Sequence, residues 1–263
     1  MSVDPTAAPA LTFHRPAGYA PMRVVAVMDE PIGYLGDLLH LDAPLSYAAY
    51  HALDLQTRKS IAPPGSPEFE DWPIDLELPL STWWLPYVVH EHGAIDPRLC
   101  KRNRNDPSDR SQRLWGWCAS AADEAAWGVR SKLEVRKRPE LGRMARYTDA
   151  RSANISSGHM KAYDLAVPTV FAREVVWFAH GDADRVRDLL NRFVPAIGKK
   201  RNIGSGTVRE WRVEACDEDR STVTEGAPRR RLPCGAARSD SMRLGAIRPP
   251  YYHHTRTVMA VEP

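Results

Sequence analysis

Residues 174–214 read EVVWFAHGDADRVRDLLNRFVPAIGKKRNIGSGTVREWRVE. The β-branched and aromatic run over 170–179 predicts a strand, and Asp182 follows it as a favourable helix N-cap. Apolar residues then recur at the i, i+3, i+4, i+7 spacing of an amphipathic helix, which the next proline ends. A glycine- and lysine-rich loop over 198–206 opens a second strand over 207–213. The fold assignment starts from this order of strand, helix, loop and strand.

An earlier part of the chain carries a similar pattern. Residues 22–28 are β-branched and predict a strand, and Asp42 is placed to cap a helix whose apolar residues begin at Leu45. Residues 130–138 predict a basic strand. Together the elements match the β-α-β-β-α-β order of an α+β, ferredoxin-like sheet, with two helices on one face and the other face free for a ligand.

The division of the chain follows from where this pattern stops. We expect residues 1–21 to be a loosely draped lead-in and residues 22–214 to form the ferredoxin-like domain. A basic insertion interrupts that domain over about 60–165, and its Trp-rich part over 60–128 has no assigned role. Residues 215–263 are proline-rich and predict an extension packed on the domain.

Charge is divided unevenly along the 263 residues. Residues 1–96 carry four Lys/Arg against thirteen Asp/Glu, whereas residues 97–263 carry thirty-two against twenty. Such asymmetry favours a polyanion bound to the basic part, although solvated surface charge produces the same count. No apolar run is long enough to cross a bilayer, and the start lacks the features of a signal peptide. Four scattered cysteines without a Cys-x-x-Cys pair indicate reduced thiols. We therefore expect a cytoplasmic protein without a membrane partner.

The loop over 198–206 is the sharpest chemical signal. Its three glycines permit positive φ values and let backbone amides approach a ligand. Phosphate oxygens suit such amides, and Lys199, Lys200 and Arg201 add compensating charge. The spacing is not that of a Walker loop, and the loop follows a helix rather than opening one. Nucleoside triphosphate and dinucleotide sites are therefore disfavoured, and an ordinary surface turn remains the alternative.

The loop and its flanks resemble the RAMP superfamily of CRISPR proteins. The block from 174 to 214 is similar to one branch, the third subunit of type IV effector complexes, which corresponds to the Cas-five-like group that caps the crRNA 5′ handle. Three further blocks fit the same branch: residues 40–43, residues 157–163 and residues 248–253. The resemblance covers about 22–58 and 129–263.

The resemblance implies a non-catalytic, RRM-like RNA-binding subunit with a basic thumb-like insertion. Its implied partners are crRNA, Cas-seven-like backbone subunits and the large subunit of the complex, with target DNA as a further candidate. Its implied role is interference with viruses and plasmids. It implies no cofactor. The implied loop contacts are Gly198, Lys199, Lys200, Arg201, Gly204, Ser205 and Gly206. The implied secondary contacts are Arg130, Lys132, Arg136, Lys137, Arg138, Arg143, Arg146, His159 and Lys161.

Catalysis is the main alternative. Relatives in the superfamily cleave crRNA precursors without metal, and a histidine general base is a natural candidate for this. The candidate histidines are His159, His180, His253 and His254. Zinc is disfavoured because the spacing of His90, His92, Cys100 and Cys118 matches no finger or ribbon. A third possibility is a ferredoxin-like domain that binds a small molecule. We expect no enzyme and no metal.

Overall fold

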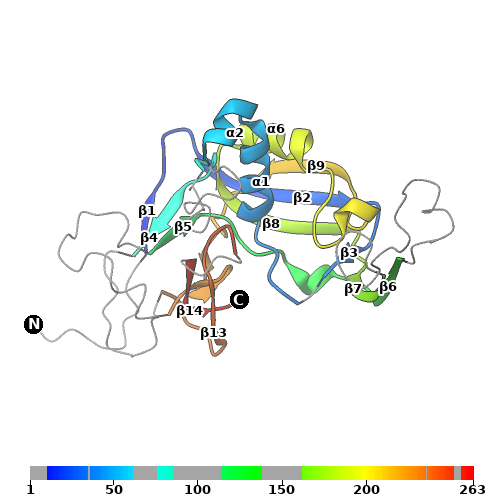
Figure 1. The fold of residues 1–263 in the computed structure, drawn as a ribbon. Helices are drawn as coiled ribbons and strands as arrows, with labels where there is room; N and C mark the ends of the chain where they lie inside the picture. Colours follow the sequence, from blue (N-terminus) through cyan, green and yellow to red (C-terminus); the bar gives the residue numbers. More distant parts are fainter. Residues whose placement is uncertain are drawn as a thin grey trace, which may run out of the picture.

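The protein has an α+β architecture built on antiparallel sheets (Figure 1). The structure, a computed structural model, describes residues 11–34, 36–61, 76–85, 114–137, 162–234, 236–251 and 256–263. Within these ranges every strand pair is antiparallel. None of the helices in them is long and apolar enough to span a membrane.

The central sheet has the strand order β8-β2-β9. Its strands are β2 (Ala20–Met28), β8 (Glu174–Gly181) and β9 (Val208–Ala215), which confirms the three strands predicted in these regions. The full β-α-β-β-α-β pattern requires a fourth strand, and the described residues do not form one. Instead residues 118–120 run irregularly along β8, where Ser120 N–H donates to the Phe178 carbonyl at 2.8 Å. The α+β class is confirmed, and the sheet has three regular strands.

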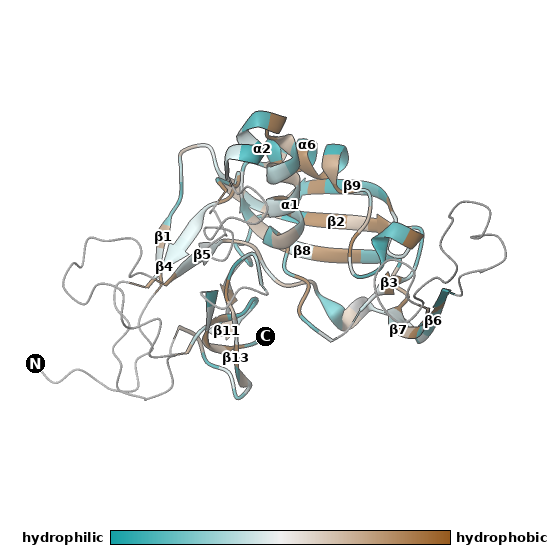
Figure 2. Ribbon diagram, in the orientation of Figure 1, coloured by the Kyte–Doolittle hydropathy of each residue, from teal (hydrophilic) through white to brown (hydrophobic). Residues whose placement is uncertain are grey.

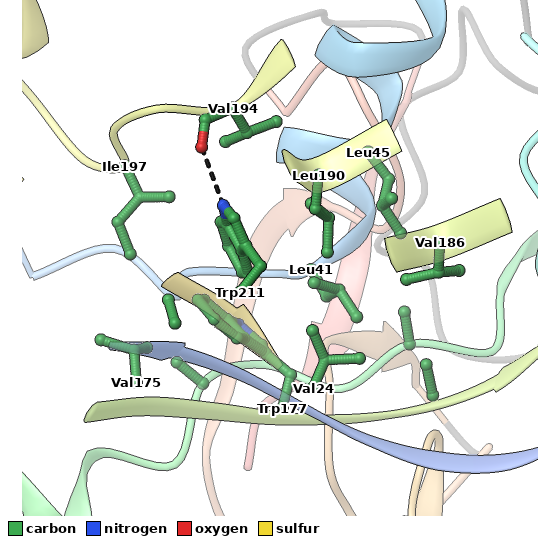
Figure 3. Close-up of a cluster of buried hydrophobic side chains, with 14 of the residues drawn as sticks. Val24, Leu41, Leu45, Val175, Trp177, Val186, Leu190, Val194, Ile197 and Trp211 are labelled. Carbon is green, nitrogen blue, oxygen red and sulfur yellow. Dashed lines mark hydrogen bonds between the residues drawn. The ribbon is translucent and has the colours of Figure 1, made fainter. Parts of the chain in front are cut away.

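Helices α1 (Asp42–Ala52) and α6 (Ala183–Phe193) cover one face of this sheet (Figure 1). Strands β2 and β8 are mostly hydrophobic, whereas β9 also carries hydrophilic residues (Figure 2). Trp177 of β8 and Trp211 of β9 stack at 5.8 Å beneath the helices (Figure 3). Each indole N–H is satisfied, that of Trp177 by the Leu39 carbonyl at 2.7 Å and that of Trp211 by the Val194 carbonyl at 2.8 Å. Both rings can therefore be buried without an unpaired donor.

The two predicted helix caps have different outcomes. Asp182 caps α6 as predicted, since its Oδ1 accepts from the N–H groups of Asp184 and Arg185, each at 3.1 Å. The prediction for Asp42 is wrong, because Leu41 is the N-cap of α1 and makes no side-chain cap bond. The Asp42 carboxylate instead forms a buried ion pair with Arg230, which competes for the oxygens that a cap would need.

The opposite face of the central sheet differs from the open ligand face that the pattern predicted. Arg23 of β2 lies 2.9 Å from Glu214 and 3.9 Å from Glu174, and Arg212 also pairs with Glu174. Phe178 is buried on this face. Side-chain ion pairs thus occupy a surface that an RRM would devote to exposed aromatic rings.

A long hairpin projects from the end of the sheet (Figure 1). Strand β6 (Arg130–Lys137) pairs with β7 (Tyr163–Val170), and β7 also pairs with the short β3 (Ile32–Gly33). Strand β6 confirms the predicted basic strand, but β7 was not foreseen and takes the beginning of the strand expected over 170–179. The residues between β6 and β7, 138–161, lie outside the described part.

The remaining strands build a second core around Trp83 and Leu232, both fully buried. One sheet joins β1 (Thr12–His14), β4 (Thr82–Trp84) and β5 (Trp115–Trp117), so the lead-in contains a strand. The other joins the carboxy-terminal strands β12 (Leu232–Pro233), β14 (Thr257–Val261) and β13 (Met242–Ala246) in that order. The other short elements are α2 (Leu55–Ile61), the 3-10 turn Glu124–Ala126, β10 (Val223–Thr224) and β11 (Ala227–Pro228).

Candidate functional site

The glycine-rich loop over 198–206 joins α6 to β9 and is tied at both ends to residues 31–33. Lys199 N–H donates to the Gly33 carbonyl at 2.8 Å, and Gly206 N–H donates to the Pro31 carbonyl at 2.9 Å. Ser205 is buried, and its hydroxyl accepts from Gly33 N–H and donates to the Pro31 carbonyl, each at 3.0 Å. Ser205 and Gly206 therefore secure the base of the loop.

The glycines serve two purposes. Gly198 has φ +83° and packs so closely that an added Cβ would lie 2.6 Å from Ile32 Cγ2. Gly206 has φ +71°, and an added Cβ there would collide with the Ile197 carbonyl. Gly204, with φ +91°, faces open space. Two of the three glycines are thus required by close packing within the protein, and the open position is at the tip.

Three consecutive amides at the tip have no acceptor among the residues that the structure describes. Lys200 is left-handed at φ 61° and ψ 31°, and the 3-10 turn Arg201–Ile203 follows it. The N–H groups of Ile203 and Gly204 close this turn, whereas those of Lys200, Arg201 and Asn202 donate to no acceptor within the described residues. A left-handed residue followed by right-handed ones turns successive N–H groups into one concavity, a nest that binds anions. The loop thus has the backbone geometry of an anion-binding nest.

The cations of the loop also have no carboxylate partners among the described residues. Lys199 and Arg201 are exposed, Lys200 is partly buried, and within the described ranges none of the three forms an ion pair with a carboxylate. Two of them rest on aromatic rings: Lys200 Nζ lies 5.7 Å from the centroid of Tyr163, and the Arg201 guanidinium lies 5.0 Å from that of Tyr47. Such exposed cation–π contacts are weak enough to be exchanged for a phosphate.

A cavity of about 250 Å³ opens beside the nest. Its floor comes from Leu165, Ala166 and Val167 of β7, and its rim from Lys199 and Lys200. An apolar lining beside two lysine side chains suits a planar, largely apolar group attached to an anion. A second cavity of about 390 Å³ is different, because it is lined by Asp123 and Glu124, with Arg229 already near Asp123. Its carboxylates do not favour an anion.

The hairpin brings only some of the predicted secondary contacts toward the loop. Residues directly opposite in an antiparallel pair share a face, so Lys137 shares the face of Tyr163, the ring that Lys200 touches. Side chains alternate along a strand, so Arg130, Lys132 and Arg136 lie on the opposite face. Arg136 is also paired with Glu134 and Asp164. The predicted contacts Arg138, Arg143, Arg146, His159 and Lys161 lie outside the described residues.

Two of the catalytic and metal candidates are buried, and the others lie outside the described residues. His180 is buried, its Nδ1 is 2.9 Å from Ser81 Oγ, and burial lowers its pKa, so it serves the packing of β8 rather than a surface site. Cys118 is also buried, which raises the pKa of its thiol to about 12. The remaining candidates, His90, His92, Cys100, His159, His253 and His254, lie outside the described residues.

Two sequence blocks far apart in the chain meet in a buried polar cluster. Asp42 and Arg230 are fully buried and 3.0 Å apart, and Tyr251 donates to Asp42 at 2.6 Å. His40 stacks on Tyr251, with ring centroids 4.6 Å apart. Burial lowers the pKa of His40 well below its ordinary value, and nearby Arg230 lowers it further. The cluster joins the start of α1 to the carboxy-terminal extension.

Comparison with known proteins agrees with the resemblance seen in the sequence. No curated protein matches the chain. A family model described as CRISPR type IV associated protein Csf3 matches residues 101–263. That segment contains the hairpin, β8, α6, the glycine-rich loop, β9 and the carboxy-terminal sheet. With most of its length inside the matched segment, the chain belongs to the Csf3 family of type IV CRISPR-associated proteins.

Proposed function

We propose that this chain is a non-catalytic RNA-binding subunit of a type IV CRISPR ribonucleoprotein. In this proposal the loop over 198–206 holds the sugar–phosphate backbone of the crRNA 5′ handle. The observation that carries the proposal is the nest at Lys200, where three amides and three cations that have no acceptor or carboxylate partner among the described residues converge. Membership of a CRISPR-associated family makes RNA the polyanion to expect at such a site.

The physical requirements of a single-stranded handle support this assignment. Unpaired RNA is gripped by phosphate contacts together with surfaces on which bases stack. The nest supplies the first, and the cavity over Leu165 with the adjacent Tyr163 supplies an apolar surface for the second. Ser205 and Gly206 act indirectly here, because their polar groups are used by residues 31–33.

The fold assignment belongs to the same proposal. Strand β2 followed by α1, and β8 followed by α6 and β9, are units of a ferredoxin-like RAMP domain in which residues 118–120 take the place of the missing strand. The β6–β7 hairpin would be the thumb. Backbone and large subunits would then seat on surfaces away from the loop, with the acidic amino-terminal third as a candidate for protein contacts.

Charge reversal tests the RNA site. The triple variant Lys199→Glu, Lys200→Glu, Arg201→Glu should lose the RNA that copurifies with the chain and bind a repeat-derived single strand more weakly. Each phosphate contact to a single strand contributes about −0.7 to the slope of log K against log salt, so losing three should flatten the slope by about 2. The matched control reverses Arg185, Arg187 and Arg192 on α6, which changes the net charge equally. Equal RNA retention in both triples would refute the assignment.

The non-catalytic part needs its own experiment. Purified chain incubated with repeat-containing RNA in EDTA should leave the RNA intact. Cleavage that stops on His159→Ala or His253→Ala would establish the endoribonuclease alternative instead. A ratio of absorbance at 260 and 280 nm typical of pure protein, combined with no binding of added RNA, would favour the small-molecule alternative.

A further inference from the structure

The surface of α1 beside the loop carries an aromatic pair that the core does not use. Tyr47 is 40% exposed, and its ring lies 4.2 Å from that of His51, at an angle of 49°. The two residues are four apart, so they lie on the same side of the helix. Leu45 and Ala48 are the buried apolar residues of this helix and pack into the core over the sheet. The pair therefore forms a small aromatic surface open to solvent.

Two arginines border this surface. The Arg201 guanidinium, which belongs to the nest, lies 5.0 Å from the Tyr47 centroid. Arg58 Nη1 lies 3.5 Å from His51 Nδ1. Partial burial lowers the pKa of His51, and the charges of Arg58 and Arg201 lower it further. At neutral pH the imidazole is therefore uncharged, so it offers a flat stacking face rather than another cation.

The Tyr47 surface adjoins the nest, so the ligand expected there is a neighbouring part of the RNA strand in the nest. Arg201 contributes both a free amide to the nest and a side chain to the Tyr47 ring. A strand whose phosphate lies in the nest therefore places a neighbouring nucleotide next to Tyr47. When Arg201 turns from the ring to that phosphate, it uncovers an aromatic face, and every nucleobase has a complementary π-face.

We propose that Tyr47 and His51 form a stacking platform for an unpaired nucleobase of the RNA strand held by the loop. The inference rests on the proposed function. Its ligand is a base without sequence selection by hydrogen bonds, adjacent to the phosphate in the nest. Tyr163, whose ring centroid lies 5.7 Å from Lys200 Nζ, offers the same strand a second ring beside the loop.

The test uses the full chain and single-stranded RNA that carries 2-aminopurine at successive positions. Stacking should quench the probe at one position with the wild-type chain, and Tyr47→Leu should restore its emission. The same variant should bind the RNA about five- to 150-fold more weakly, the range that loss of one base–aromatic stack produces. Tyr47→Phe should stay within about twofold. The control Phe13→Leu removes another exposed ring with an arginine over it, on β1, and should bind like wild type.

The possible outcomes distinguish failure of the stacking-platform proposal from failure of the RNA-binding proposal. If the wild type binds RNA but no position is quenched, or if Tyr47→Leu and His51→Leu both bind normally, the platform is overturned and the loop assignment stands. If the wild type binds no RNA, both are overturned. If the RNA is cut in EDTA and His51→Ala abolishes the cut, the histidine is a general base and the platform is overturned.

Discussion

Replacing Arg230 with methionine should be among the most damaging single changes in this protein. The guanidinium is fully buried and donates to five oxygens: the carbonyls of Trp117, Ala119 and Ile247, the hydroxyl of Tyr251 and Oδ2 of Asp42. Methionine fills much of the volume but leaves the buried Asp42 carboxylate without its counter-charge. Breaking a buried ion pair from one side costs about 3–5 kcal/mol.

That cost is large enough to measure without ambiguity. For a chain of this size 1 kcal/mol corresponds to about 2–4 °C in Tm, so Arg230→Met should lower Tm by roughly 6–20 °C. Asp42→Asn should have a comparable effect, because it leaves the cation uncompensated. The double variant should be more stable than the sum of the two single effects predicts, because neither charge remains buried alone.

The assays are thermal unfolding for Tm and urea unfolding for the free energies, each followed by tryptophan fluorescence and by circular dichroism, with Arg192→Met as the control. Arg192 pairs with Asp188 at 3.2 Å on the exposed side of α6, where an ion pair contributes less than about 1 kcal/mol. The reasoning would be refuted if Arg230→Met were no more damaging than Arg192→Met. Strict additivity in the double variant would also count against it.

Three smaller changes test other parts of the structure. Burial lowers the pKa of His40, so its imidazole is neutral in the folded protein, and the stability that depends on it is complete above pH ~6.5 and is lost as the pH falls. Between pH 7 and 5, His40→Phe should therefore lose less stability than wild type in urea titrations. Gly204→Ala should cost about 1–2 kcal/mol through its positive φ alone, and Gly206→Ala should shift the urea midpoint further because its Cβ also meets a carbonyl. Asp182→Ala should cost about 1 kcal/mol by removing the α6 cap, whereas Asp182→Asn should restore most of it.

Local patterns predicted the elements whose determinants are local. The stripe and cap of α6 are a few residues apart, and both are found where the sequence places them. Asp42 shows the opposite case, since it has the right residue type and position for a cap. Its partners, however, are 188 and 209 positions away, and no local pattern can show that a distant arginine claims the carboxylate.

For a related reason, the sequence could not predict which face of the hairpin each basic side chain occupies. The sequence predicts β6 as a basic strand but predicts no strand over 163–169, so the register between β6 and β7 could not be known. Register is what assigns Lys137 to the face of Tyr163 and Lys132 to the other. The signal for Tyr47 was available, because the apolar stripe of α1 already left that position off the core side.

The surplus of basic residues in the carboxy-terminal two-thirds includes buried as well as exposed side chains. Arg230, Arg231 and Arg256 are all at most 6% exposed, and Arg231 is paired with Glu262 at 2.6 Å, so these charges hold the extension together and add little to the field outside. Lys199 and Arg201 are exposed and, within the described residues, free of carboxylates. The amino-acid composition therefore overstates how much positive charge a bound polyanion would contact. The exposed charge of Lys199 and Arg201 lies beside the amides of the nest. A phosphate is favoured at the loop because charge and amides coincide there, and a high arginine count elsewhere would not substitute for that coincidence.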